Sequence, residues 1–166
     1  MLALAGLLVA GQIDLTAGEL VVGGSTYNQS IELSSAVGLG GAVGYYGRIL
    51  SIAFAPHYVP EHTLAGEYGA TFAQFDAGVQ LGIHNAITPR VELLAQLTPA
   101  YSMLYDDVID DASGLALTVG GGAVYRLSQR FQIGATASYQ YGTQHTSEGD
   151  LAATRLLSLG VFVMAR

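Results

Sequence analysis

The chain has 166 residues, of which 51% are hydrophobic and only 11% are charged, and its formal net charge is −7. Soluble domains carry about 25% charged residues, so this composition excludes an ordinary wetted surface. The chain has only six basic residues, all arginines, which excludes nucleic acid as a partner, because phosphate binding needs clustered positive charge. It has no cysteine, which excludes disulfides and thiolate metal sites.

The first element is an apolar segment, residues 1–11, with the sequence MLALAGLLVAG. It resembles the apolar core and small-residue end of a secretory signal, although no basic residue precedes the core. We interpret residues 1–11 as the remnant of a signal peptide and residues 12–166 as one domain. The alternative is that Leu7–Ala10 lead into the first strand.

Apolar and polar residues then alternate along the chain, as in strands with two different faces. The pattern in 12–24 slips near Glu19, and Pro99 lies inside 91–105, where it predicts a bulge or a local break because proline lacks the backbone donor. The clearest segment, 130–142, places Ile133 and Tyr139 on one face and Gln132 on the other. The predicted strands are 12–24, 37–46, 49–59, 74–84, 91–105, 115–127, 130–142 and 154–166.

The connectors between these strands alternate in predicted length. Short ones fall at 46–48, 86–90 and 127–130, and long ones at 25–35, 60–68, 106–114 and 143–153. Arginines lie at or beside the short connectors, whereas the long ones carry most of the acidic residues. This alternation is typical of an up-and-down membrane barrel with tight periplasmic turns and longer outer loops. The predicted fold is therefore all-β, an eight-stranded antiparallel transmembrane β-barrel.

Two kinds of eight-stranded barrel share this pattern, a soluble lipocalin-like barrel with apolar residues inside and a membrane barrel with apolar residues outside. The polar face is rich in Gly, Ser, Thr and Gln and the chain has no Lys, so it cannot build a soluble exterior. Tyrosines near the strand ends predict an aromatic girdle at headgroup level. Its members are Tyr45, Tyr58, Tyr101, Tyr105, Tyr125, Tyr139 and Tyr141.

The lumen of an eight-stranded barrel is only wide enough for side chains to fill, which excludes a general diffusion pore. Inward-facing charges need partners, because a buried unpaired charge is costly. We therefore predict a polar network that plugs the lumen. Its predicted members are Asp76, His84, Arg90, Glu92 and Arg126.

The Gly-rich strand Gly38-Leu39-Gly40-Gly41-Ala42-Val43-Gly44-Tyr45-Tyr46, the strand number and the alternating loops resemble OmpA/OmpX-type small outer-membrane barrels over residues 12–166. The resemblance implies the bacterial outer membrane as location and its lipids as partners. For a barrel with acidic outer loops we expect a structural or surface-interaction role, with an extracellular or envelope protein as a further partner of the long loops. Phe162 is near the C-terminus but not terminal, unlike the aromatic residue that ends many such barrels.

We predict no catalytic site. His145-Thr146-Ser147 with Glu148 resembles the His-x-Ser pair of lipid A deacylases, but the last strand offers no carboxylate. Asp106, Asp107, Asp110 and Asp111 could supply Ca²⁺ with oxygen ligands, yet they lack the Gly and the spacing of a Ca²⁺ loop, so we expect a solvated acidic loop. We predict a non-enzyme without cofactor or metal, with a lipid A-modifying enzyme and a soluble ligand-binding barrel as alternatives.

Overall fold

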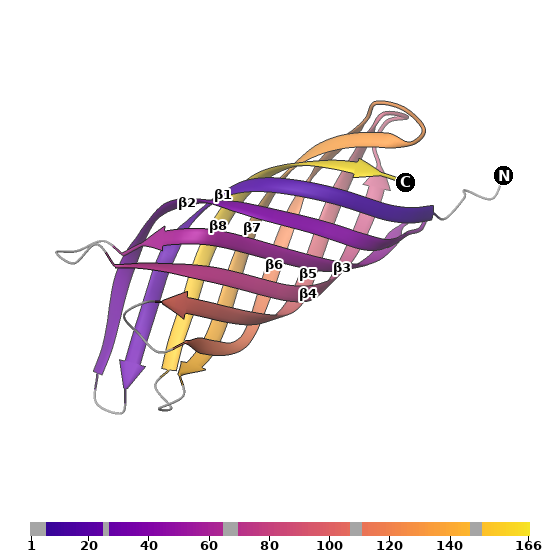
Figure 1. Cartoon of the computed structure of the whole chain (residues 1–166). Helices are drawn as coiled ribbons and strands as arrows, with labels where there is room; N and C mark the ends of the chain where they lie inside the picture. Colours follow the sequence, from indigo (N-terminus) through magenta and orange to yellow (C-terminus); the bar gives the residue numbers. More distant parts are fainter. Residues whose placement is uncertain (1–5, 25–26, 65–69, 107–110, 147–150) are drawn as a thin grey trace.

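A computed structural model describes residues 6–24, 27–64, 70–106, 111–146 and 151–166. In it each strand pairs antiparallel with its chain neighbours, and β8 pairs with β1 to close a barrel (Figure 1). This confirms the predicted fold class. The strands are β1 (Gly6–Gly24), β2 (Tyr27–Tyr46), β3 (Leu50–Thr63), β4 (Thr71–Ala86), β5 (Val91–Asp106), β6 (Ala112–Arg126), β7 (Phe131–Thr146) and β8 (Leu151–Ala165).

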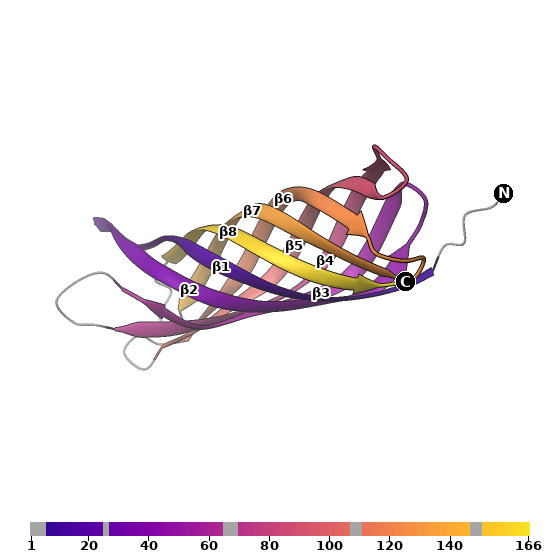
Figure 2. The same ribbon diagram turned by 90° about the horizontal axis from the view of Figure 1, so that it is seen from above.

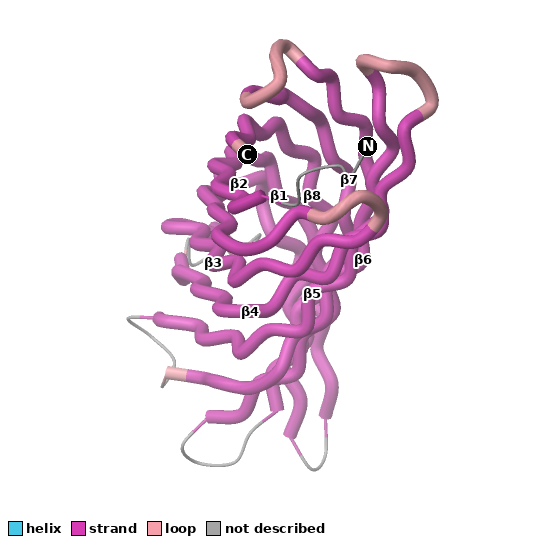
Figure 3. The backbone as a smooth tube through the Cα atoms, turned by 90° about the vertical axis from the view of Figure 1, so that its right-hand side faces the viewer, coloured by secondary structure: helices cyan, strands magenta, loops and turns pink. Residues whose placement is uncertain are grey.

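The two ends of the barrel differ in their connections. Three short turns, at 47–49, 87–90 and 127–130, gather at the same end as both termini, as Figures 2 and 3 show. We call this the inner end, because a barrel with an even number of strands has its termini on the periplasmic side together with the tight turns. The opposite end is the outer end. No helix among the described residues could span a membrane.

The predicted long connectors at the outer end are wrong in length, because the strands continue into them. In the first, residues 27–33 of β2 pair with residues 18–24 of β1. The strands of the other three hairpins likewise end at Thr63, Asp106 and Thr146. Strands of 14 to 20 residues exceed the roughly 9–11 that cross a bilayer. The outward face of these strand extensions is mostly polar. The alternation of apolar and polar residues therefore stops there, while the backbone hydrogen-bond ladder between the strands continues.

The first strand begins before the predicted boundary at Gln12. Residues Gly6–Gly11 already lie in β1 and pair with β2, as the alternative interpretation of this segment expects. Processing of residues 1–11 stays a prediction. The expected slip near Glu19 corresponds to a register shift between Thr16 and Gly18, where β2 carries one extra residue.

Prolines interrupt the ladders without breaking the barrel. At Pro99 the pairs Gly78↔Ala100 and Leu81↔Leu97 flank an unpaired stretch in the β4–β5 ladder, and the register is unchanged across it. The predicted local break is therefore present, without a bulge. A register shift of the β3–β4 ladder lies at Pro60, where a missing donor again favours irregular pairing.

The apolar faces of the strands point outward. Ile133, Leu81 and Val119 are 41%, 44% and 53% exposed, whereas Gln132 is fully buried. On β7 the outward apolar face runs from Phe131 to Tyr141, the length that a tilted membrane crossing needs. An apolar exterior of this kind excludes the soluble lipocalin-like alternative, in which these side chains would fill the core.

Candidate functional site

The inner end of the lumen holds an inner charged cluster around Glu92, a buried residue of β5. Its carboxylate accepts a hydrogen bond of 2.7 Å from the hydroxyl of Tyr46 and pairs with Arg126. Arg166 Nη2 lies 3.6 Å from the same carboxylate, and His84 stacks on the Tyr46 ring at a centroid distance of 3.9 Å. One carboxylate thus joins β2, β5, β6 and the C-terminal residue across the lumen.

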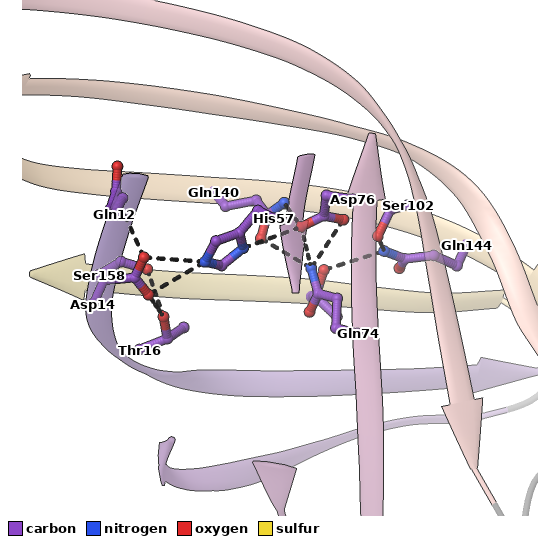
Figure 4. Close-up of polar contacts among 11 residues, drawn as sticks. Gln12, Asp14, Thr16, His57, Gln74, Asp76, Ser102, Gln140, Gln144 and Ser158 are labelled. Carbon is purple, nitrogen blue, oxygen red and sulfur yellow. Dashed lines mark hydrogen bonds and ion pairs between the residues drawn. The ribbon is translucent and has the colours of Figure 1, made fainter. Parts of the chain in front are cut away.

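A central polar cluster lies further along the lumen and is built around His57 (Figure 4). The Nε2 atom of His57 lies 3.1 Å from Asp14 Oδ2, and its Nδ1 lies 3.8 Å from Asp76 Oδ2. Both carboxylates are buried, and amides and hydroxyls satisfy their remaining oxygens: Thr16 donates to Asp14, and Gln140 donates to Asp76. Two buried carboxylates on β1 and β4 are therefore held by one imidazole on β3.

A cavity of about 130 Å³ remains in the lumen between these two clusters. Gln80, Gln96, Ser138 and Ser158 line it together with apolar side chains, and Gln80 donates a hydrogen bond of 2.6 Å to Gln96. Its lining is mixed, with polar side chains in the middle and apolar ones such as Leu94 and Phe162 beside them. The lumen is thus open in its middle and filled at its ends.

The outer end of the lumen is filled by an outer apolar cluster. It consists of Leu20, Leu33, Phe72, Leu104, Ala112, Ala152 and Leu156. His62 of β3 lies beside it, fully buried, with its ring 5.0 Å from that of Phe72. Neither ring nitrogen of His62 has a hydrogen-bond partner among the described residues. The barrel is thus closed with charge at its inner end and with hydrocarbon at its outer end.

The predicted lumen network is only partly brought together. Glu92 and Arg126 form an ion pair, and His84 lies 3.8 Å from Glu92. Asp76 belongs to the separate central polar cluster. Arg90 contradicts the prediction, because it lies in the β4–β5 turn, is exposed, and donates to the hydroxyl of Tyr125 on the lipid side.

Sequence reasoning missed several lumen residues, and the strand period holds the signal for most of them. Tyr46 follows the girdle residue Tyr45 directly, so its ring must point the other way, into the lumen. Asp14 and His57 both lie on the polar faces of their strands. Arg166 carries no such signal, because it reaches Glu92 from beyond the last strand residue, Ala165.

All the predicted girdle tyrosines lie on the lipid-facing side of the barrel wall, with exposed fractions between 40% and 50%. Tyr45 and Tyr125 lie near the inner end, and the other members lie further along their strands toward the outer end. A half-exposed ring with a terminal hydroxyl suits both borders of the hydrocarbon layer.

The candidate Ca²⁺ ligands and the deacylase-like segment lie partly outside the described residues. Asp107 and Asp110 lie outside the described residues, and Asp111 is exposed. The described part of the chain contains no group of three or more residues suited to a metal ion. His145 is exposed near the end of β7, while Ser147 and Glu148 of the deacylase-like segment are not among the described residues.

Neither a protein-family model nor a curated protein sequence matches the chain. Solved structures do match its fold. Neisserial surface protein A, 12% identical, matches with a TM-score of 0.73 over 98% of this chain and 99% of its own. The outer membrane protein OprG from Pseudomonas aeruginosa, also 12% identical, matches with a TM-score of 0.59 over 96% of this chain and 95% of its own. The chain has the fold of the small eight-stranded barrels of the bacterial outer membrane, the architecture that OmpA/OmpX-type proteins share.

Proposed function

We propose that this barrel is a closed, non-enzymatic component of the outer membrane that serves envelope structure or surface interaction. The observation that carries the proposal is the filling of the lumen by side chains at both ends. An ion moving from the inner end would first meet Glu92 with its two arginines, and would then have to cross the outer apolar cluster. Passage through a tightly filled apolar layer strips a solute of its water, which is unfavourable for any polar solute.

The outer end supports the surface-interaction part of the proposal. The strands extend beyond the membrane there, and exposed Glu32, Glu61 and Asp111 lie on or beside these extensions. Further acidic residues in three of the four outer connections raise the negative charge of this end. Such a surface fits a basic patch of an extracellular or envelope protein, whose approach it would accelerate electrostatically.

The closed lumen is tested by conductance. Heat-modifiable gel mobility first shows that the refolded protein forms a barrel. In planar bilayers we then expect no channel openings above the bare-bilayer background. Swelling of liposomes in small sugars gives a second readout that does not depend on charge. Steady openings, or swelling proportional to the amount of folded protein, would refute a closed barrel.

The non-enzymatic part is tested separately with lipid A as substrate. We expect no release of acyl chains by the folded wild type above the level of a heat-unfolded sample. Release that is abolished by Ser147→Ala, with the barrel still folded, would replace the proposal with an acyl hydrolase. Protease cleavage at residues 106–111 on intact cells would check which end of the barrel faces outward.

A further inference from the structure

The three short turns at the inner end share one composition. Each contains one exposed arginine and one exposed large aliphatic residue. The pairs are Arg48 with Ile49, Arg90 with Ile87, and Arg130 with Leu127. The three aliphatic side chains are 57%, 60% and 59% exposed, more than many residues on the lipid-facing wall. A repeated pairing of this kind indicates a shared environment for the turns.

Two of the turns are also built alike. In the β4–β5 turn the hydroxyl of Thr88 accepts hydrogen bonds from the backbone N–H groups of Arg90, at 3.2 Å, and Val91, at 3.0 Å. In the β6–β7 turn the hydroxyl of Ser128 accepts the equivalent bonds from Arg130, at 3.2 Å, and its neighbour. The backbone of each arginine is therefore fixed by its own turn, which orders the chain before any ligand arrives.

These arginines are free for a partner. Among the described residues none of Arg48, Arg90 and Arg130 takes part in an ion pair, and Arg90 Nη1 contacts only the girdle hydroxyl of Tyr125, at 3.2 Å. The one acidic residue close to the short turns in sequence, Glu92, is buried and already holds Arg126. Within the part of the chain that the structure describes, no side-chain carboxylate is paired with the three exposed guanidinium groups.

We propose that Arg48, Arg90 and Arg130 form an arginine collar that binds the phosphate groups of anionic phospholipids in the periplasmic leaflet. Because the turns lie between β2 and β3, β4 and β5, and β6 and β7, the arginines recur every second strand around the rim. Guanidinium groups form paired hydrogen bonds with phosphate oxygens. The aliphatic partners Ile49, Ile87 and Leu127 favour a lipid over the cell-wall polymer as the ligand, because they need acyl chains to cover them.

The collar is tested with the protein refolded in zwitterionic micelles and observed through its backbone amide signals. Soluble dihexanoyl-phosphatidylglycerol is titrated into one sample and dihexanoyl-phosphatidylcholine into a second, and the two titrations are compared. We expect the anionic lipid to shift the amides of residues 88–91 and 128–131 at concentrations at least about tenfold lower than the zwitterionic lipid, with the preference shrinking as salt is added. The combined variant R48Q/R90Q/R130Q should lose the preference.

Arg155→Gln is the matched control, because it removes one arginine from the outer end and should keep the preference. If the combined variant does not fold, R90Q and R130Q alone should each weaken anionic-lipid binding on the order of five-fold. Ile87→Ser with Leu127→Ser should weaken binding of both lipids and leave their ratio unchanged.

Equal binding of the two lipids, or a preference that survives in the combined variant, would overturn the collar. Shifts of the same amides by a soluble peptidoglycan fragment, at concentrations where the anionic lipid gives none, would assign the arginines to the cell wall instead. The inference rests on the proposed placement in a membrane but not on a closed lumen, so channel openings in the conductance experiment would leave it standing.

Discussion

Two glutamates at opposite ends of the barrel are held by the same chemistry in different surroundings. Glu92 at the inner end accepts a hydrogen bond from the Tyr46 hydroxyl and pairs with Arg126. Glu19 at the outer end accepts one of 2.6 Å from the Ser30 hydroxyl and pairs with Arg155 at 2.7 Å. The side chain of Glu92 is 7% exposed and that of Glu19 is 36% exposed.

The difference shows how each end is closed. At the inner end the ion pair lies inside the lumen and is part of the seal. At the outer end the ion pair lies on the outside, and the lumen behind it is filled by leucines and a phenylalanine. Breaking a buried ion pair leaves an uncompensated charge, whereas breaking an exposed one leaves a hydrated charge. The same substitution should therefore have unequal effects at the two ends.

Glu92→Ala should have the largest effect. It leaves Arg126 and Arg166 facing each other in the lumen and removes the acceptor of the Tyr46 hydroxyl. We expect the free energy of unfolding to fall by about 3–5 kcal/mol, measured by urea unfolding in vesicles. Glu92→Gln, which keeps an acceptor for Tyr46, should lose less.

Conductance separates the two seals. Glu92→Ala should stay electrically silent, because the outer apolar cluster still blocks the lumen. Combining it with a polar residue in that cluster, such as Leu156→Ser, should be required before channel openings appear. Openings in Glu92→Ala alone would mean that the inner charged cluster is the only seal.

Leu156→Ala tests the outer end directly. Leu156 is 1% exposed inside the outer apolar cluster, and its neighbour Leu157 is 56% exposed on the lipid side. Truncating a buried leucine removes its burial and leaves a cavity, so we expect a loss of about 2–5 kcal/mol in unfolding free energy. Leu157→Ala is the matched control, and its unfolding free energy should fall by clearly less. Equal losses would contradict the assignment of the two faces of β8.

The membrane-spanning part of the fold could be predicted from the sequence because the bilayer imposes a strict period on it. Residues such as Ile133 and Gln132 alternate between lipid and lumen, and this fixed both the strands and their faces. The outer extensions could not be predicted in the same way. Outside the membrane, Ser30 and Glu32 on the outer face of β2 are polar, so nothing in the pattern separated strand from loop.

The lumen contacts were harder to predict than the faces. The strand period can place Asp76 and His57 inside the barrel, but it does not give the stagger between neighbouring strands. That stagger brings His57 opposite Asp76 in the β3–β4 ladder. The strand register, which turn geometry and bulges set, therefore determines which lumen-facing side chains contact one another.

His62 provides a pH test of the outer end. It lies four residues beyond the girdle residue Tyr58, outside the membrane-spanning segment, and burial lowers its pKa to about 4 from an ordinary 6.5. Burial is the largest cause of this lowered pKa; the nearby His57 contributes to it, and Asp76 acts in the opposite direction. Because the unfolded chain takes up this proton first, stability should fall as the pH drops from about 6.5 to 4, by about 3 kcal/mol.

The measurement is the free energy of unfolding as a function of pH for the wild type and for His62→Leu. The variant should lack the part of the acid destabilisation that falls between pH 6.5 and 4, because it has no imidazole to protonate. His145→Gln is the control, since His145 is exposed near the same end. Parallel profiles for wild type and His62→Leu would mean that the imidazole is not buried in a neutral form.

Arg155→Gln should have the smallest effect and completes the comparison with Glu92. The hydroxyl of Ser30 and the guanidinium of Arg155 hold the pKa of the Glu19 carboxyl below its ordinary value of 4.5. A lowered pKa in the folded state stabilises above the unfolded value and stops doing so as the pH falls through the folded one. We therefore expect a small loss of melting temperature in Arg155→Gln at pH 7, which shrinks in high salt and as acid protonates Glu19. A loss as large as that of Glu92→Ala, unchanged by salt, would mean that this pair is buried in the membrane-embedded protein and that the two ends are closed in the same way.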